Sequence, residues 1–342
     1  WPKVSEAARA FASKFPGSAS LPMVLYLDGI AGQKDRRFEE SLATFEKVLK
    51  GDSPFAPRAL FMKGFTLLLA ERNQEAIATF EAFGKKFPDH ELSEAAAYWR
   101  GMGYSLDKQY AKAREAMDDY LRKYKDGQYA GTATFRKAYC AQQLEDYQTS
   151  MKELRAYMRN FPGHEEASEA RILLGDALMN EGQMEEGIAA FKSIPKEDTR
   201  FYEEGVFKVG KALKLMEEND RLLDHMQDFV KESPRSPRVG EAIFNIGWVY
   251  RQKDQNEKAR DVYWTAIKEL GNDPSIRSVE DLFPALSKLY KGEDGSPKYL
   301  ALLQDLQEEA EKSDRKTLAM RALWAKAKKK KKSDPEMSRQ LL

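Results

Sequence analysis

Cysteine and histidine are scarce in this 342-residue chain, which has one Cys and three His residues. Cys140 can form neither an internal disulfide nor a cysteine metal cluster, and we expect it to be a small buried apolar residue. His90, His164 and His225 are spread along the sequence, and His164 lacks the second His four residues later that a zinc-protease helix carries. The sequence therefore predicts no metal site and no cofactor.

Catalytic motifs and long apolar runs are also missing. There is no Walker sequence and no Gly-x-Ser-x-Gly elbow, and the segment Gly101-Met102-Gly103 lacks the third glycine of a dinucleotide fingerprint. The longest apolar run, around residues 65–70, is far shorter than the ~18 residues that a membrane span needs. We therefore expect a chain that is not an enzyme and has no membrane span.

Neither sign of charge dominates, because 56 Lys and Arg residues face 55 Asp and Glu residues and the net charge is +1. This balance provides no electrostatic footprint for nucleic acid. The chain starts at Trp1 without an initiator Met or an apolar leader. We therefore expect a fragment of a longer protein, from which a signal peptide or a lipid-anchored Cys could have been removed.

A repeat is present instead. A small residue, called the anchor below, recurs seven times at intervals of 35 or 37 residues. The anchors are Gly29, Gly64, Gly101, Ala138, Gly175, Gly210 and Gly247. Three residues before each anchor stands a large apolar residue, aromatic in six of the seven repeats. These residues are Tyr26, Phe61, Tyr98, Phe135, Ile172, Phe207 and Phe244.

Each repeat divides into two amphipathic segments of helical period around a short polar turn, which predicts a helical hairpin. Twelve residues after the anchor the chain places a small residue in all repeats except at Leu222, and sixteen after it a large apolar one. Small anchors let the backbones of paired helices approach closely, and this contact offsets the helix penalty of glycine, about 1 kcal/mol.

The order of small residue, aromatic residue and Gly on the first helix, then Ala and Phe on the second and Pro at its end, resembles the tetratricopeptide repeat. That repeat usually spans ~34 residues. The longer step here, with endings such as Phe15-Pro16-Gly17-Ser18, is similar to repeats of bacterial cell-envelope proteins, including outer-membrane assembly lipoproteins and the Tol-Pal accessory protein. The resemblance implies an all-α, right-handed superhelical solenoid of antiparallel helical hairpins. It also implies a location in the bacterial periplasm or at the outer membrane, with the cytoplasm as the alternative.

We expect a single repeat array over residues 1–342, because stacked hairpins bury a continuous core. It would consist of a partial N-terminal hairpin at 1–21, seven repeats over 22–275, a degenerate repeat at 276–314, and a capping helix with a Lys-rich tail at 315–342. The seven repeats would start near residues 22, 57, 94, 131, 168, 203 and 240. The lysine run at 328–332 reads as a solvated tail, with contact to an acidic surface as the alternative.

Candidate binding residues come from the first helix of each hairpin, where positions −3, +1 and +4 from the anchor share a face. The resemblance places this face on the concave wall. Aromatic residues at −3 recur in nearly every repeat, as packing requires, whereas positions +1 and +4 vary, as a specific ligand site requires. The candidate partner-binding residues are Phe65, Tyr139, Lys211, Lys214, Trp248 and Arg251.

We therefore predict a non-catalytic protein–protein interaction scaffold that holds a peptide or segment of a protein partner in its concave groove, in bacterial envelope assembly. Two alternatives stay open. The chain could be the repeat domain of a larger enzyme or regulatory protein whose active part lies outside it. It could also be a helical solenoid that binds single-stranded nucleic acid, which the near-zero net charge disfavours.

Overall fold

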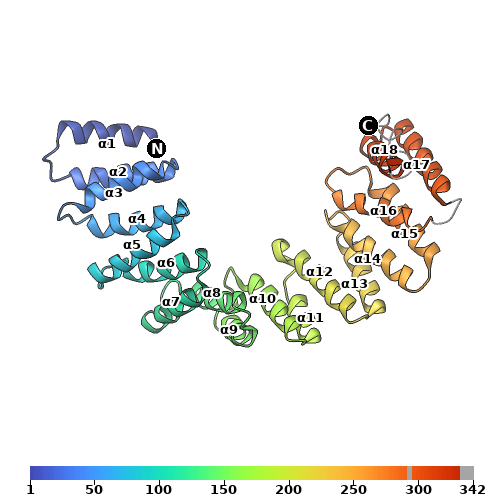
Figure 1. Ribbon diagram of the computed structural model, residues 1–342, viewed down its shortest axis with the longest axis horizontal. Helices are drawn as coiled ribbons and strands as arrows, with labels where there is room; N and C mark the ends of the chain where they lie inside the picture. Colours follow the sequence, from blue (N-terminus) through green and yellow to red (C-terminus); the bar gives the residue numbers. More distant parts are fainter. Residues whose placement is uncertain (291–294, 332–342) are drawn as a thin grey trace. The chain divides into compact units, whose positions relative to one another are not determined.

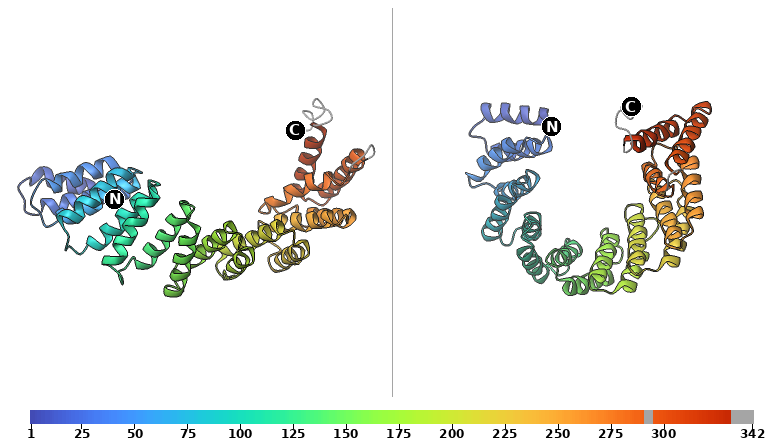
Figure 2. Two further views of the ribbon diagram at one scale, coloured as in Figure 1. Left: turned by 60° about the horizontal axis from the view of Figure 1, so that its bottom comes forward. Right: turned by 45° about the vertical axis from the view of Figure 1, so that its right-hand side comes forward.

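The computed structural model describes residues 1–290 and 295–331, and within them it contains α-helices, one 3₁₀ helix and no strand (Figure 1). The predicted all-α fold is therefore confirmed. The chain divides into two compact units, Trp1–Phe201 and Tyr202–Leu342, here called the N-terminal and C-terminal units. In the N-terminal unit, successive helices pack side by side in sequence order (Figure 1, Figure 2).

The N-terminal unit consists of one helix, α1 (Pro2–Lys14), followed by five hairpins. Their first helices are α2 (Leu21–Lys34), α4 (Ala56–Leu69), α6 (Ser93–Leu106), α8 (Ala130–Gln143) and α10 (Ala167–Asn180). Their second helices are α3 (Phe38–Leu49), α5 (Asn73–Lys86), α7 (Tyr110–Lys123), α9 (Tyr147–Asn160) and α11 (Met184–Lys192). Each first helix contacts the first helix of the next hairpin, from α2 to α10.

The C-terminal unit starts within a long helix, α12, which is followed by α13, by the helix pairs α14–α15 and α17–α18, and by a short segment, η1 and α16, between these pairs. The α-helices are α12 (Thr199–Leu215), α13 (Asn219–Glu232), α14 (Val239–Gln252), α15 (Asn256–Leu270), α16 (Leu282–Ser287), α17 (Gly295–Lys312) and α18 (Lys316–Lys331). The 3₁₀ helix η1 (Arg277–Asp281) precedes α16, and α17 packs along α18.

The glycine anchors mark the point where the two helices of a hairpin touch. A Cβ atom added to Gly64 would lie 2.8 Å from Cζ of Phe80, and one added to Gly101 would lie 2.8 Å from Cε of Met117. Both distances are shorter than real Cβ contacts, so each large side chain at position +16 occupies the space that a Cβ would need. The pattern of small anchor and large +16 residue is therefore a packing pair.

Every hairpin turn uses the same backbone geometry. The residue seven positions after each anchor, and also Asp314 between α17 and α18, has a positive φ, which is 53–60° at non-glycine positions and 77° at Gly182. These residues are Arg36, Glu71, Lys108, Glu145, Gly182, Glu217, Asp254 and Asp314. The next residue donates its backbone N–H to a carbonyl five residues back, as Arg72 does to Leu67 at 2.9 Å, which closes a Schellman motif. The turn at Asp314 joins α17 to α18 in the same way.

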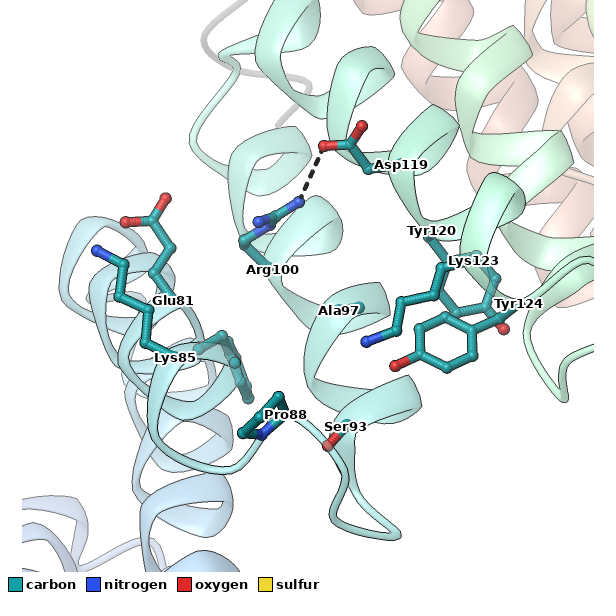
Figure 3. Close-up of a pocket in the computed structure, with 12 residues that line it drawn as sticks. Glu81, Lys85, Pro88, Ser93, Ala97, Arg100, Asp119, Tyr120, Lys123 and Tyr124 are labelled. Carbon is teal, nitrogen blue, oxygen red and sulfur yellow. Dashed lines mark hydrogen bonds and ion pairs between the residues drawn. The ribbon is translucent and has the colours of Figure 1, made fainter.

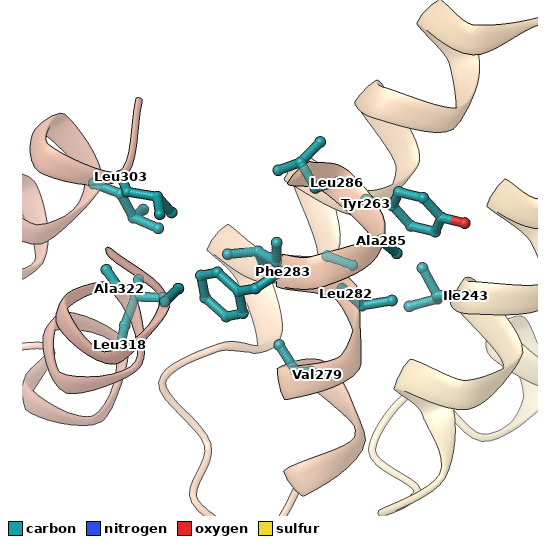
Figure 4. Packing of buried hydrophobic residues seen from close by; sticks show 14 of the residues in the cluster. Ile243, Tyr263, Val279, Leu282, Phe283, Ala285, Leu286, Leu303, Leu318 and Ala322 are labelled. Carbon is teal, nitrogen blue, oxygen red and sulfur yellow. The ribbon is translucent and has the colours of Figure 1, made fainter. Parts of the chain in front are cut away.

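The buried core of the hairpin α14–α15 continues beyond the last anchor into α16, α17 and α18. Ile243 and Tyr263 from the hairpin α14–α15 pack in the same buried cluster as Phe283 of α16 and Leu318 of α18 (Figure 4). The buried guanidinium of Arg321, 5% exposed, donates to the carbonyls of Gly271, Asp273 and Ile276 at 2.9–3.1 Å. These charge-assisted bonds fix α18 to the loop before η1.

A membrane-spanning helix would need more length and apolar character than any helix in residues 1–290 and 295–331 has.

Candidate functional site

Phe65 and Tyr139, the two candidates of the N-terminal unit, are half-buried on α4 and α8. Phe65 contacts the ring of Trp99 edge-on, with ring centroids 4.9 Å apart. Tyr139 lies 6.3 Å from the ring of Tyr110 and 5.7 Å from the guanidinium of Arg136, and burial raises the pKa of its hydroxyl. The described contacts of these two rings are with their own neighbours and not with each other.

Position +4, expected on the same face, is closed in the first three hairpins of the N-terminal unit and half-buried at Gln142 and Met179 in the next two. Gln33, Leu68 and Ser105 are only 5%, 8% and 9% exposed. The amide of Gln33 donates to the hydroxyl of Thr66 on the next first helix at 2.7 Å. Neighbouring first helices therefore cover these side chains, and little of them is left for a ligand.

In the C-terminal unit the same positions carry exposed or half-buried cations. The ammonium of Lys214 on α12 lies 3.9 Å from the centroid of the Trp248 ring on α14, well within the ~6 Å range of a cation–π contact. Burial lowers the pKa of Lys214. Lys211, one turn earlier on α12, is exposed, and Arg251 is half-buried on α14. The structure thus brings Lys214 and Trp248 together, with Lys211 on the same helix.

Lys211 and Lys214 line an open depression of about 380 Å³ between α12 and α14. Its two acidic side chains are already engaged: Glu241 accepts from Arg238 at 2.8 Å, and Glu204 lies 3.8 Å from Lys208. Arg238 also stacks on the ring of Phe207, with its guanidinium carbon 3.6 Å from the ring centroid. The depression therefore combines aromatic surface with cations.

The three candidate cations have no acidic partner among the described residues. Over residues 1–290 and 295–331, neither Lys211, Lys214 nor Arg251 forms an ion pair with an Asp or Glu side chain. Burial raises the pKa of the nearby Tyr263 to about 12, and the charge of Arg251 opposes this rise. A partly desolvated cation without a counter-charge is stabilised when an anion binds next to it. This part of the first-helix face is thus suited to an acidic ligand.

A second depression lies on the N-terminal unit, where the sequence indicated none (Figure 3). Its volume is about 490 Å³, and it is formed by α5, α6 and α7. Arg100 faces Asp119 at 3.5 Å across it, with Lys85 and Lys123 nearby (Figure 3). A sequence pattern could have indicated this depression, because several second helices end in a Lys followed by an aromatic residue. Lys123 and Tyr124 are such a pair here, with the ammonium 5.1 Å from the ring centroid. The predicted binding residues all lie on first helices and do not include this depression.

The histidines and the cysteine serve local structure. Nδ1 of His90 accepts the N–H of Leu92 at 3.1 Å, and Nδ1 of His164 lies 2.6 Å from Oε2 of Glu166. Cys140 is fully buried, and burial raises the pKa of its thiol. In the part of the chain that the structure describes, no group of three His, Cys, Asp or Glu side chains is arranged to hold a metal ion.

Comparison with protein families finds two repeat regions and one larger match. Models described as tetratricopeptide repeat match residues 29–91 and 240–268. A model described as outer membrane lipoprotein (YfiO) matches residues 90–200. The predicted resemblance to tetratricopeptide repeats and to outer-membrane assembly lipoproteins is therefore confirmed.

Solved structures resemble the chain in fold. The apo form of RapI is 13% identical with a TM-score of 0.53, and the match covers 92% of this chain and 99% of that one. The Naa15/Naa10 complex bound to HypK-THB is 13% identical with a TM-score of 0.50, covering 95% of this chain and 52% of that one. MamA from Desulfovibrio magneticus RS-1 is 15% identical with a TM-score of 0.44, covering 51% and 92%. No curated protein matches the sequence.

Proposed function

We propose that this chain of tetratricopeptide repeats is a non-catalytic protein–protein interaction scaffold that binds a peptide or segment of a partner protein along its first helices. The binding residues would be Lys211, Lys214, Trp248 and Arg251 in the C-terminal unit, with Phe65 and Tyr139 as aromatic contacts in the N-terminal unit.

The observation that carries this proposal is the pair of Lys214 and Trp248. The ammonium lies 3.9 Å from the ring centroid and has no acidic partner among the described residues. Burial lowers the pKa of Lys214, so its charged form lacks part of the stabilisation that water would give. A carboxylate that binds beside it would restore that stabilisation, and the indole face of Trp248 would contact an apolar side chain of the same ligand.

The chemistry favours a partner segment that alternates carboxylates with apolar side chains. Trp and Arg are the residue types that most often dominate the energy of protein interfaces. Because Lys214 and Trp248 lie on neighbouring first helices, a segment that contacts both would lie across these helices. Such a segment could be extended or a single amphipathic helix.

We further propose that the scaffold acts in assembly at the bacterial envelope, in the periplasm or on the outer membrane. Support comes from the match of residues 90–200 to the outer membrane lipoprotein model.

Site-specific photo-crosslinking tests the proposal. A p-benzoylphenylalanine group at Lys211 should capture a partner segment from an envelope extract of a bacterium with an outer membrane. The same group at Lys231, an exposed lysine on the second helix α13, is the matched control. Mass spectrometry of the crosslinked peptide identifies the segment, whose affinity is then measured by calorimetry.

The variants Lys214→Gln and Trp248→Ala should each weaken this affinity, the second by about 2 kcal/mol or more as for an interface hot spot. Equal capture at Lys211 and Lys231, or an affinity that neither variant changes, would show that the first-helix face is not the binding site.

A further inference from the structure

We propose that the last three helices form a second binding site, which takes an acidic peptide segment with an apolar side chain next to its carboxylates. The helices α16, α17 and α18 surround a cavity of about 290 Å³. It goes beyond the function proposed above, because none of its residues lies on the first-helix face that carries Lys214 and Trp248.

The floor of this cavity is aromatic and rigid. Phe283 is 2% exposed, and its side chain lies between the core residues Leu318 and Ala322 and the rest of α16 (Figure 4). Tyr299 is 1% exposed, and its hydroxyl donates to the carbonyl of Phe283 at 2.9 Å. Trp324, by contrast, is 41% exposed at the side of the cavity. A fixed apolar floor with one open aromatic wall is the usual setting for an apolar side chain of a ligand.

The rim of the cavity is cationic. The ammonium of Lys328 lies 4.4 Å from the Trp324 ring, and that of Lys329 donates to the hydroxyl of Ser287 at 3.0 Å. Lys288 adds a third, exposed ammonium. Within residues 1–290 and 295–331, none of these lysines forms an ion pair, and no lining residue is acidic. The rim therefore carries three positive charges without a counter-charge among the described lining residues, and bound carboxylates would supply one.

Charge on the neighbouring surface favours a short acidic peptide over nucleic acid. Glu308, Glu309 and Glu311 are exposed on α17, the helix that carries Tyr299. These carboxylates make the surface of the same helix negative outside the lysine rim, which disfavours a long polyanion. A peptide with a few carboxylates around one apolar side chain satisfies both the rim and the floor.

Fluorescence anisotropy with three labelled dodecapeptides tests the site on the full chain. The probes are (Glu-Glu-Leu)₄, (Gln-Gln-Leu)₄ without the carboxylates, and (Glu-Glu-Ser)₄ without the apolar side chain. We expect (Glu-Glu-Leu)₄ to bind at least about tenfold more tightly than either of the others, with an affinity that falls as salt is added.

Variants locate the binding. Trp324→Ala should weaken (Glu-Glu-Leu)₄ binding by about tenfold or more, and Trp324→Phe should restore much of it. The double variant Lys328→Gln/Lys329→Gln should weaken it by about three- to tenfold, because two exposed ion pairs are lost. Lys268→Gln is the matched control, since Lys268 lies 5.8 Å from the ring of Trp264 outside the cavity. Lys268→Gln should therefore bind unchanged. Because (Glu-Glu-Leu)₄ also has the chemistry proposed for the first-helix site, the Trp324 and Lys328/Lys329 variants are compared again in a Lys214→Gln/Trp248→Ala background, where their effects should persist.

Several outcomes would overturn the proposal. One is equal binding of the Glu and Gln peptides; another is an effect of Lys268→Gln as large as that of the Lys328/Lys329 variant, or loss of the Trp324→Ala effect in the Lys214→Gln/Trp248→Ala background. If (dT)₁₂ binds more tightly than (Glu-Glu-Leu)₄ and this binding is lost in Trp324→Ala, the cavity is instead a nucleic-acid site. A large gain in peptide affinity after removal of residues 333–342 would make the chain's own end the occupant. If light scattering shows a dimer and Trp324→Ala dissociates it, the cavity is instead occupied by a second copy of this chain. Circular dichroism of each variant checks that the helices are intact.

Discussion

The fit between Gly64 and Phe80 leads to a quantitative prediction about the packing that holds each hairpin together. In the variant Gly64→Ala the new Cβ would lie 2.8 Å from Cζ and 2.9 Å from Cε1 of Phe80. Phe80 is 2% exposed and its ring contacts Phe61 with centroids 5.7 Å apart, so it has little room to move. Overpacking of this kind costs about 1–3 kcal/mol, and the better helix propensity of Ala returns about 1 kcal/mol. We expect a net loss of about 1 kcal/mol.

A second substitution should relieve this loss. In the hairpin α8–α9 the anchor is Ala138 and the +16 residue is Leu154, both fully buried in one cluster. A Cβ at the anchor is therefore compatible with the smaller Leu side chain. Phe80→Leu alone leaves a cavity and should cost about 1–2 kcal/mol. The double variant Gly64→Ala/Phe80→Leu should cost less than the sum of the two, with a coupling free energy of about 1–2 kcal/mol.

Urea unfolding of the four proteins of this cycle measures the coupling, and hydrogen exchange of the α4 amides reports the local stability of the hairpin, because repeat arrays open in parts. Gly84→Ala is the matched control. It changes a glycine near the end of α5 where an added Cβ meets no atom within 4 Å, so it should stabilise by up to about 1 kcal/mol.

Additive costs in the double variant would refute the reasoning, since they would mean that the anchor is small for a reason other than the side chain at +16. A loss of stability in Gly84→Ala as large as that in Gly64→Ala would refute it too, because the effect would then not depend on the close contact.

Three further predictions concern the turns, the thiol and the buried phenols. Glu71 has a φ of 60°, so Glu71→Gly should stabilise the protein by about 0.5–1 kcal/mol in urea titration, whereas Gly182→Ala should destabilise it by at least as much. Cys140 is fully buried with a raised thiol pKa, so Ellman's reagent at pH 8 should modify it only after unfolding; rapid reaction of the folded protein would contradict this burial. Burial raises the pKa of Tyr98 and of Tyr263 to about 12. Because the folded-state pKa exceeds the unfolded value of about 10, their contribution is present below pH 10 and the thermal midpoint should fall as pH rises from 10 through 12.

The hairpins could be predicted from the sequence because their determinants are local. The anchor and the +16 residue contact each other within one hairpin, so their sizes recur at fixed spacing in every repeat. The pairing of α17 with α18 is different. Its turn at Asp314 has the common geometry, but the anchor position there is Gln307. Because no small residue marks the anchor position, the repeat spacing cannot be followed in the sequence beyond Gly247. The leucines of residues 282–306 do not indicate which helices pair.

The candidate site was harder to predict because the exposure of a first-helix residue depends on the neighbouring first helix. Helical periodicity places position +4 on the same face of the first helix in every repeat. Leu68 and Ser105 are nevertheless covered by the next hairpin. Lys214 and Arg251 occupy the same position and remain half-exposed. Their long side chains can cover apolar surface with the methylene groups and still bring the charge to solvent. A cationic side chain at +4, and not variability alone, is therefore a sequence signal for residues on this face that a partner can reach.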